Sequence, residues 1–214
     1  MSGPDQDYAT FHAPRFDYLM MLVRRHVGPD DTILDVGLGP FHDRLKAEYP
    51  QAVSLGLPLH ALDGHIPFDL MTSGHAPIPT DRRFDLILFA EVIEHLYLEP
   101  EVPLRALAAA LKPGGRLIVQ TPNAASLVKR LALLIGRQPY DALRTDPENP
   151  GHVREMTRAE LIRAVEAAGL SVEQHAFADY FATPGGGPLR GLRGLAQRIF
   201  PFLREGQTVV ARRS

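Results

Sequence analysis

The chain has 214 residues and a formal net charge of −2, and it contains no cysteine. This length suits one domain with a sizeable core, so we expect residues 1–214 to form a single domain. The slightly acidic balance argues against a nucleic-acid binder, which needs a basic face to neutralise phosphates. The lack of cysteine excludes disulfides and thiolate chemistry. With neither a signal peptide nor an apolar run of about eighteen residues, we expect a cytoplasmic protein.

The first part of the chain predicts one helix. Residues 1–13 are polar and fit two alternatives, a loosely ordered terminus or a lid that folds over a ligand. From Pro14 on, apolar residues recur at helical spacing as far as Gly28, which predicts a helix beginning at Pro14. This helix leads into a short apolar run at residues 31–36 that is typical of a buried parallel strand.

The predicted strand ends in an acid followed by a glycine turn. Asp35, Gly37 and Gly39 form the pattern Asp-Val-Gly-Leu-Gly, in which the glycines let the backbone turn tightly and approach a ligand. This pattern resembles the first motif of class I S-adenosylmethionine-dependent methyltransferases. The resemblance implies that Asp35, Gly37 and Gly39 bind S-adenosylmethionine. The motif's third glycine is missing, because Phe41 follows Pro40.

Strands and helices alternate along the rest of the chain. Expected strands lie at 52–57, 65–70, 84–90, 116–121, 171–178 and 208–211, and expected helices at 41–50, 103–112 and 126–135. A capping box at Thr157 and Glu160 begins another helix. The alternation predicts an α/β, doubly wound sheet with helices on both faces. The turn Pro113-Gly-Gly before the fifth strand also resembles the methyltransferase family, which implies a Rossmann-like seven-stranded sheet, mostly parallel with an antiparallel last strand.

The resemblance also suggests further cofactor-binding residues. In the family, the second strand ends in an acid that holds the ribose hydroxyls, but Leu57 and Pro58 occupy that place here. Asp69 and Leu70 resemble the position that meets the adenine, although Asp69 alternatively caps the following loop. Ala90 and Glu91, at the end of the 84–90 strand, complete the expected cofactor site, because ligands bind beyond the carboxyl ends of parallel strands.

Acids and histidines gather just after this strand. If a helix begins at residue 91, then Glu91, Glu94 and His95 share one face. The stretch resembles ubiquinone-pathway O-methyltransferases and small-RNA 2′-O-methyltransferases, in which it holds a divalent ion. His152 resembles the later histidine of the RNA enzymes, so the resemblance implies a metal site of Glu91, Glu94, His95 and His152 for Mg²⁺ or another divalent cation. In metal-free relatives the histidine instead lines the acceptor pocket or acts as a general base. His95, followed by His152, is the catalytic candidate under both alternatives.

Two later segments are candidates for the acceptor side. Residues 124–156 and 180–203 are rich in apolar side chains, and we treat 180–203 as a substrate-side insertion. Within it, arginines mix with large apolar residues between 189 and 203. The pattern fits either a helix that covers the sheet or an amphipathic element in peripheral contact with a membrane.

The leading hypothesis is O-methylation of a small metabolite, lipid or glycan-like acceptor. Two alternatives stay open at this point. One is an RNA-end 2′-O-methyltransferase with a divalent metal, favoured by the acids and histidines and opposed by the net charge. The other is a non-catalytic binding protein on a degenerate methyltransferase fold, which the missing acid at Pro58 would explain.

Overall fold

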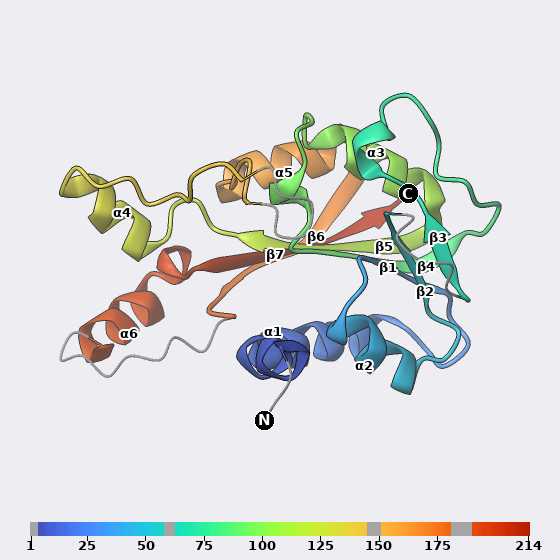
Figure 1. The fold of residues 1–214 in the computed structure, drawn as a ribbon, viewed down its shortest axis with the longest axis horizontal. Helices are drawn as coiled ribbons and strands as arrows, with labels where there is room; N and C mark the ends of the chain where they lie inside the picture. Colours follow the sequence, from blue (N-terminus) through green and yellow to red (C-terminus); the bar gives the residue numbers. More distant parts are fainter. Residues whose placement is uncertain (1–3, 58–62, 145–150, 181–189) are drawn as a thin grey trace.

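The computed structural model describes residues 4–57, 63–144, 151–180 and 190–214. A seven-stranded sheet runs through the middle of the molecule in the order β3-β2-β1-β4-β5-β7-β6 (Figure 1). The strands are β1 (Ile33–Val36), β2 (Val53–Gly56), β3 (His65–Pro67), β4 (Phe84–Ala90), β5 (Leu111–Pro122), β6 (Leu170–Ala178) and β7 (Gly206–Arg213). The first five pair in parallel, and β7 runs antiparallel to both β5 and β6. The predicted fold class, including the antiparallel last strand, is confirmed.

Helices cover both faces of the sheet (Figure 1). On one face, α1 (Pro4–His26) and α2 (Pro40–Glu48) pack on the core that contains Ile33 and Leu86. On the other face, α3 (Glu101–Ala110) and α5 (Arg158–Ala167) pack on the core that contains Leu34 and Val119. Side chains of a strand point alternately to its two faces, so strands covered on both faces are apolar along their whole length. Because helices cover both faces of the sheet, every residue of β1 is buried.

Two further helices lie beyond the sheet rather than over it. These are α4 (Leu127–Leu134) and α6 (Arg190–Ile199), found at the left end of Figure 1 past the end of β5 and the start of β7. None of the α4 side chains is buried. The prediction of a helix at 126–135 is confirmed. The alternative that the 189–203 segment covers the sheet is wrong, because α6 projects past the sheet and exposes Leu195 and Ile199.

Two expectations about local structure are corrected. The first helix begins at Pro4 rather than Pro14, so residues 4–13 are helical and Pro14 lies inside α1. Inside a helix, proline removes one amide donor and its ring crowds the carbonyl of residue i−4, at a cost of about 3 kcal/mol that packing can offset. Residues 91–95 do not start an α-helix, since Ile93–His95 forms a single 3₁₀ turn, η2. Glu91, with φ of 56°, precedes this turn in the left-handed region.

Several details of the described residues match the expected chain geometry. The capping box of α5 is present, with Thr157 N donating to Glu160 Oε2 at 2.9 Å and Glu160 N donating to Thr157 Oγ1. Two more 3₁₀ turns complete the elements, η1 (Leu70–Thr72) and η3 (Pro201–Leu203).

Pro58 lies outside the described residues, as do positions 181–189 of the expected insertion. In the described part of the chain, none of the helices has the length and apolar character needed to span a bilayer.

Candidate active site

The turn after β1 leaves open space at the carboxyl end of the sheet. Gly37 and Gly39 have φ angles of 130° and 154°, in the region that favours glycine. Among the described residues beyond their chain neighbours, no atom lies within 4 Å of the place where a Cβ would stand on either glycine. Together with Asp35 and His42, these glycines line a cavity of about 530 Å³. We call it the donor cavity.

A buried pair stabilises this turn. His42 Nδ1 lies 3.1 Å from Asp35 Oδ2, and both side chains are almost fully buried. Burial raises the pKa of Asp35, and the hydrogen bond from His42 opposes that rise. The pair joins the end of β1 to the first turn of α2, so the two glycines between them are held at both ends.

The remaining walls of the donor cavity come from α1 and the end of β4. Arg15 and Phe16 approach from α1, and Ala90 and Glu91 follow from β4. The Glu91 amide donates to Gln120 O at 2.8 Å, which fixes the left-handed backbone of Glu91 against β5. Such a conformation in a residue other than glycine is uncommon and is often found at functional sites. The structure therefore brings five predicted cofactor residues to one cavity: Asp35, Gly37, Gly39, Ala90 and Glu91.

The two other predicted cofactor residues lie elsewhere. Asp69 caps η1, where its Oδ1 accepts a hydrogen bond of 2.9 Å from the Met71 amide. Leu70 is buried in the core. Neither residue lines the donor cavity. Their contacts therefore favour the capping alternative for Asp69, and adenine binding by this pair stays a prediction.

A second cavity, of about 500 Å³, adjoins the first. Arg15 and Glu91 line both, so the two cavities meet at these side chains. The second cavity contains the two catalytic candidates, His95 and His152, together with Lys129. We call it the acceptor cavity, because it is the space next to the predicted cofactor site.

Backbone hydrogen bonds bring the two histidines together across a long stretch of chain. The amides of Val153 and Arg154 donate to Glu94 O at 2.7 and 3.1 Å, which fastens the 151–154 segment to η2. His95 Nδ1 lies 3.0 Å from Gly151 O. The His95 and His152 rings then pack edge to face, with centroids 4.9 Å apart.

The hydrogen bonds of both rings define which nitrogen carries the proton. A carbonyl oxygen only accepts, so His95 Nδ1 must donate to Gly151 O. His152 Nδ1 lies 3.1 Å from Glu155 Oε1, and the Lys129 ammonium contacts the other oxygen of the same carboxylate. Burial lowers the pKa of His152, with His95 and Lys129 adding to the effect, and this shift favours the neutral ring. In the neutral form of either ring, Nε2 is then the nitrogen that keeps a lone pair for a proton or a metal ion.

Glu94 completes a cluster of three side chains. It is fully buried, and its Oε2 accepts a hydrogen bond of 2.9 Å from Thr121 Oγ1. Its Oε1 receives no hydrogen bond within the described part of the chain and lies 4.0 Å from His95 Nε2. Burial, followed by the nearby Glu91, raises the pKa of Glu94 well above its ordinary value. Glu94, His95 and His152 each offer a ligand atom within 4.8 Å of the others.

This cluster fits a divalent cation. A buried carboxylate oxygen without a partner would gain a positive charge opposite it, and a histidine ligand typically donates its other ring N–H to a carboxylate or a carbonyl, as His152 and His95 do. Two imidazoles with one carboxylate suit Mn²⁺ or Zn²⁺ better than Mg²⁺, which prefers oxygen ligands. Glu91, the fourth residue of the expected metal set, lines the cavity but is outside the group of three.

Sequence reasoning missed two basic residues of the site. Arg15 is 5% exposed, and its charge acts on Asp35, Glu91 and Glu94. Lys129 is largely buried, and burial lowers its pKa to about 8 while nearby acids oppose that change. Nothing in the helical pattern of the first helix distinguishes Arg15 from an ordinary surface arginine. In the sequence, Lys129 is only a charged residue within the mostly apolar segment 126–135.

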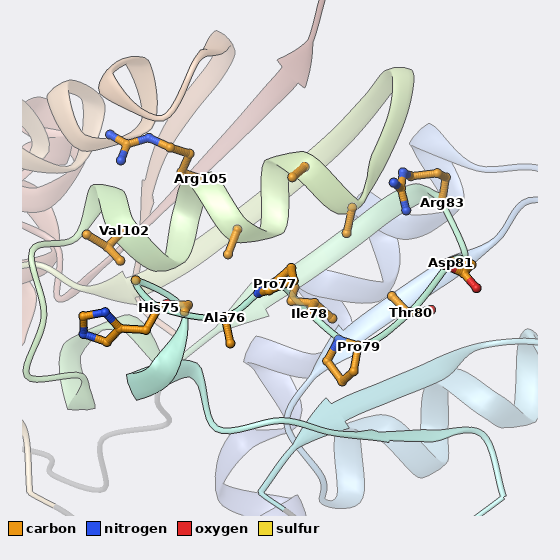
Figure 2. A pocket seen from close by; sticks show the side chains of 15 residues that line it. His75, Ala76, Pro77, Ile78, Pro79, Thr80, Asp81, Arg83, Val102 and Arg105 are labelled. Carbon is orange, nitrogen blue, oxygen red and sulfur yellow. The ribbon is translucent and has the colours of Figure 1, made fainter.

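A cavity larger than either of these, of about 900 Å³, lies elsewhere. Figure 2 shows it between α3 and the 73–83 loop, with Val102 and Arg105 on the helix side and Pro77, Ile78 and Pro79 on the loop side. None of the predicted site residues lines it. The loop ends at Arg83, just before β4 begins, so this cavity belongs to the other end of that strand. Size therefore does not identify the site in this molecule.

The donor cavity lies at the switch point of the sheet, where β1 lies between β2 and β4, and enzymes with an open α/β sheet bind their ligands at such a point. Residues 15–175 match the methyltransferase domain family. The chain belongs to this family, and it is an S-adenosylmethionine-dependent methyltransferase.

Similar proteins agree with this assignment. The chain is 29% identical over 192 residues to a ubiquinone biosynthesis O-methyltransferase of Methylobacterium nodulans, covering 80% of this chain and 76% of the relative. Its fold resembles an S-adenosylmethionine-dependent methyltransferase of Clostridium acetobutylicum, with TM-score 0.63, 12% identity, and coverage of 95% and 92% of the two chains. It also resembles the N-methyltransferase NodS of Bradyrhizobium japonicum in complex with S-adenosyl-L-homocysteine, with TM-score 0.57, 15% identity and coverage of 99% and 93%.

Proposed function

We propose that this enzyme methylates a hydroxyl group of a small acceptor that binds in the acceptor cavity. The observation that carries the proposal is the junction of the two cavities at Arg15 and Glu91, next to the rings of His95 and His152. A hydroxyl group needs a proton acceptor when it is methylated, and these rings supply one. The relative of 29% identity named as an O-methyltransferase supports the same class of acceptor.

The donor cavity supports binding of S-adenosylmethionine through its backbone turn and one charged side chain, Arg15. Gly37 and Gly39 allow the cofactor to approach the turn, Asp35 and His42 hold that turn, and Arg15 offers a cation for a carboxylate. When bound, S-adenosylmethionine supplies an electrophilic methyl group, which leaves S-adenosylhomocysteine. The rate then depends mainly on how well the protein positions the acceptor oxygen.

His95 has the geometry of a general base. Its Nδ1–H is held by Gly151 O, so Nε2 is the nitrogen whose lone pair can take the hydroxyl proton in the neutral ring. In this role the enzyme holds the proton on Nε2 during methylation, and the Glu94 carboxyl lies 4.0 Å away. His152 orients the acceptor from the neighbouring position, supported by Glu155 and Lys129.

We include a divalent cation as part of the proposal. Glu94, His95 and His152 would hold it, and it would lower the pKa of an acceptor hydroxyl bound beside it. A bound cation and a general-base His95 are alternatives for the same ring nitrogen, since Nε2 cannot serve both at once. They differ in their response to a chelator.

The experiment combines cofactor binding with methyl transfer. We expect S-adenosylhomocysteine to bind to the wild type and to His95→Gln with similar affinity in titration calorimetry, because His95 lies outside the donor cavity. Release of S-adenosylhomocysteine is then followed with a panel of catechols, phenols and aliphatic alcohols, with Mn²⁺ and with a chelator. His95→Gln should lower turnover by about 100-fold or more, the usual contribution of a general base.

The matched control is His75→Gln. His75 is an exposed histidine of the large cavity in Figure 2, so its substitution should change neither binding nor turnover. Retention of full turnover by His95→Gln would overturn the role of His95. Failure of S-adenosylhomocysteine to bind would contradict the donor cavity itself. An RNA oligonucleotide in the acceptor panel tests the RNA-end alternative, which would be favoured if it alone accepted methyl groups.

A further inference from the structure

Exposed apolar side chains concentrate at one end of the molecule. Of the sixteen large apolar side chains that are exposed among the described residues, eleven belong to two segments, 128–143 and 195–202. These segments comprise α4 with the chain that follows it and the second half of α6 with η3. We call the eleven residues the end surface: Val128, Leu131, Leu133, Leu134, Ile135, Tyr140, Leu143, Leu195, Ile199, Phe200 and Phe202. Scattered apolar residues are normal on a protein surface, whereas a gathered set marks an interaction site.

The two segments form one continuous surface. The Arg130 guanidinium lies 5.7 Å from the ring centroid of Phe202, which joins α4 to η3. The Asn123 side chain donates to the backbone oxygens of Phe202 and Arg204, at 2.9 and 2.8 Å. Figure 1 shows α4 and α6 at the same end of the molecule, past the sheet.

Two polar side chains of the α6 helix, Arg193 and Gln197, bind to the rest of the protein. Gln197 is buried and donates to Asp179 Oδ1 at 3.2 Å, and Arg193 donates to Glu205 Oε1 at 2.6 Å. Leu195 and Ile199, one turn apart, are 56% and 59% exposed. A helix that served to cover the sheet would have the opposite arrangement, with its apolar stripe inside.

The two segments that carry the end surface are basic, whereas the chain is acidic overall. Residues 124–144 carry four basic residues and one acid, Asp141, and residues 190–204 carry four arginines and no acid. Two of these cations are paired with acids outside the segments, Lys129 with Glu155 and Arg193 with Glu205. Because the net charge of the chain is −2, the remaining residues are strongly acidic by comparison. Both the apolar residues and the cations therefore gather at the same end.

We propose that the end surface docks on an anionic lipid bilayer. Basic side chains are attracted to anionic headgroups while apolar side chains enter the boundary between headgroups and acyl chains, and this surface offers both together. A nucleic acid would match the cations but not the exposed leucines of α4. A second copy of the chain would match the apolar residues but would place like charges opposite each other. The proposal goes beyond methyl transfer and does not depend on the identity of the acceptor.

The test is flotation of the full chain with vesicles. We expect the wild type to float with vesicles of phosphatidylcholine and phosphatidylglycerol, and to bind vesicles of phosphatidylcholine alone at least about tenfold more weakly. Leu134→Glu and Ile199→Glu should each weaken binding to the anionic vesicles by about tenfold or more. The matched control is Tyr97→Glu, since Tyr97 is 80% exposed and Leu134 is 81% exposed, but Tyr97 lies outside the end surface.

Charge is tested with a second pair of variants. The double substitution Arg137→Glu and Arg198→Glu should reduce binding to anionic vesicles by about tenfold or more, and the double substitution Arg82→Glu and Arg163→Glu, at exposed positions elsewhere, should not. Melting temperatures and circular dichroism spectra verify that each variant is folded.

Three outcomes would overturn the proposal. In the first, the wild type does not float with anionic vesicles. In the second, it binds a single-stranded RNA more tightly than the anionic vesicles, and Leu134→Glu leaves this binding intact. In the third, sedimentation shows a dimer that Leu134→Glu converts to a monomer, with no binding to vesicles. Binding of S-adenosylhomocysteine is measured on the same samples, so a failure of docking is distinguished from a failure of the methyltransferase assignment.

Discussion

The donor and acceptor cavities differ in how the chain builds them. The part of the donor cavity that includes Asp35, the two glycines and His42 comes from eight consecutive residues. The acceptor cavity takes its walls from residues as far apart as His12 and Glu205. A strand, turn and helix in succession set the first geometry locally, while the second requires that separate loops meet. The difference predicts that the donor cavity responds to backbone changes and the acceptor cavity to charge and hydrogen bonding.

The largest expected effect lies in the acceptor cavity. Glu94→Gln removes the negative charge of the buried cluster and keeps its shape, so Mn²⁺ affinity should fall by more than the roughly 10–100-fold typical of losing an outer-shell partner. Binding is followed by electron paramagnetic resonance of Mn²⁺. Glu99→Gln, at an exposed position near η2, is the control and should bind like the wild type. Equal Mn²⁺ binding by Glu94→Gln and the wild type would show that the cluster does not hold a cation.

Cofactor binding in the donor cavity should be lost when the backbone of its glycine turn is changed. Gly37→Val places a branched side chain at φ of 130° and into open space that the cofactor would use. We expect S-adenosylhomocysteine affinity to fall about 30-fold, from this loss of space and a backbone strain of about 1–3 kcal/mol. Gly28→Ala, at a turn without a left-handed φ, should keep its affinity. Titration calorimetry decides the matter, and an unchanged affinity in Gly37→Val would place the cofactor elsewhere.

The features that could be predicted from the sequence are those set locally, as in the donor cavity, and not those that need distant segments to meet, as in the acceptor cavity. The strand at β1, its glycine turn, β4 and the capping box of Thr157 were all predicted, because each is set by neighbouring residues. The meeting of His95 and His152 was expected from a family resemblance and not from spacing. It depends on amides of residues 153 and 154 that donate to Glu94 O, a contact without any local signal. The exposed position of α6 was likewise beyond local patterns, since an amphipathic helix looks the same whichever face is buried.

The acceptor cavity should also respond to pH. Burial raises the pKa of Glu94 well above its ordinary value in the folded protein, so below that raised pKa a cation must displace a proton from this carboxyl. Mn²⁺ affinity should therefore rise with pH, by up to about tenfold per unit for each proton released, and level off above the pKa of Glu94. In Glu94→Gln the rise should be absent at the pH where His152 is already neutral. A wild-type affinity that falls with rising pH would contradict this assignment.

The smallest expected effect concerns the stability of the acceptor side. Lys129 has a pKa of about 8 in the folded protein against an ordinary value of 10.5. Between these values the unfolded chain binds more protons, so this group makes the free energy of unfolding rise with pH across that window. The rise should be on the order of 1–3 kcal/mol and should disappear in Lys129→Met. Urea unfolding of the wild type and of Lys129→Met at about pH 8 and pH 10 measures this rise in each protein. The tyrosines titrate in both proteins, so their contribution cancels when the two rises are compared.

The position of Arg15 has a thermodynamic consequence. Together with Glu91, this arginine lines both cavities, so it contributes to the free energy of binding of two different ligands. If the first ligand fixes its side chain, the second ligand meets a site that is already ordered or already occupied. Linkage then requires that each ligand change the dissociation constant of the other by the same factor. A single coupling constant would then relate the affinity for the acceptor with and without the cofactor to the affinity for the cofactor with and without the acceptor.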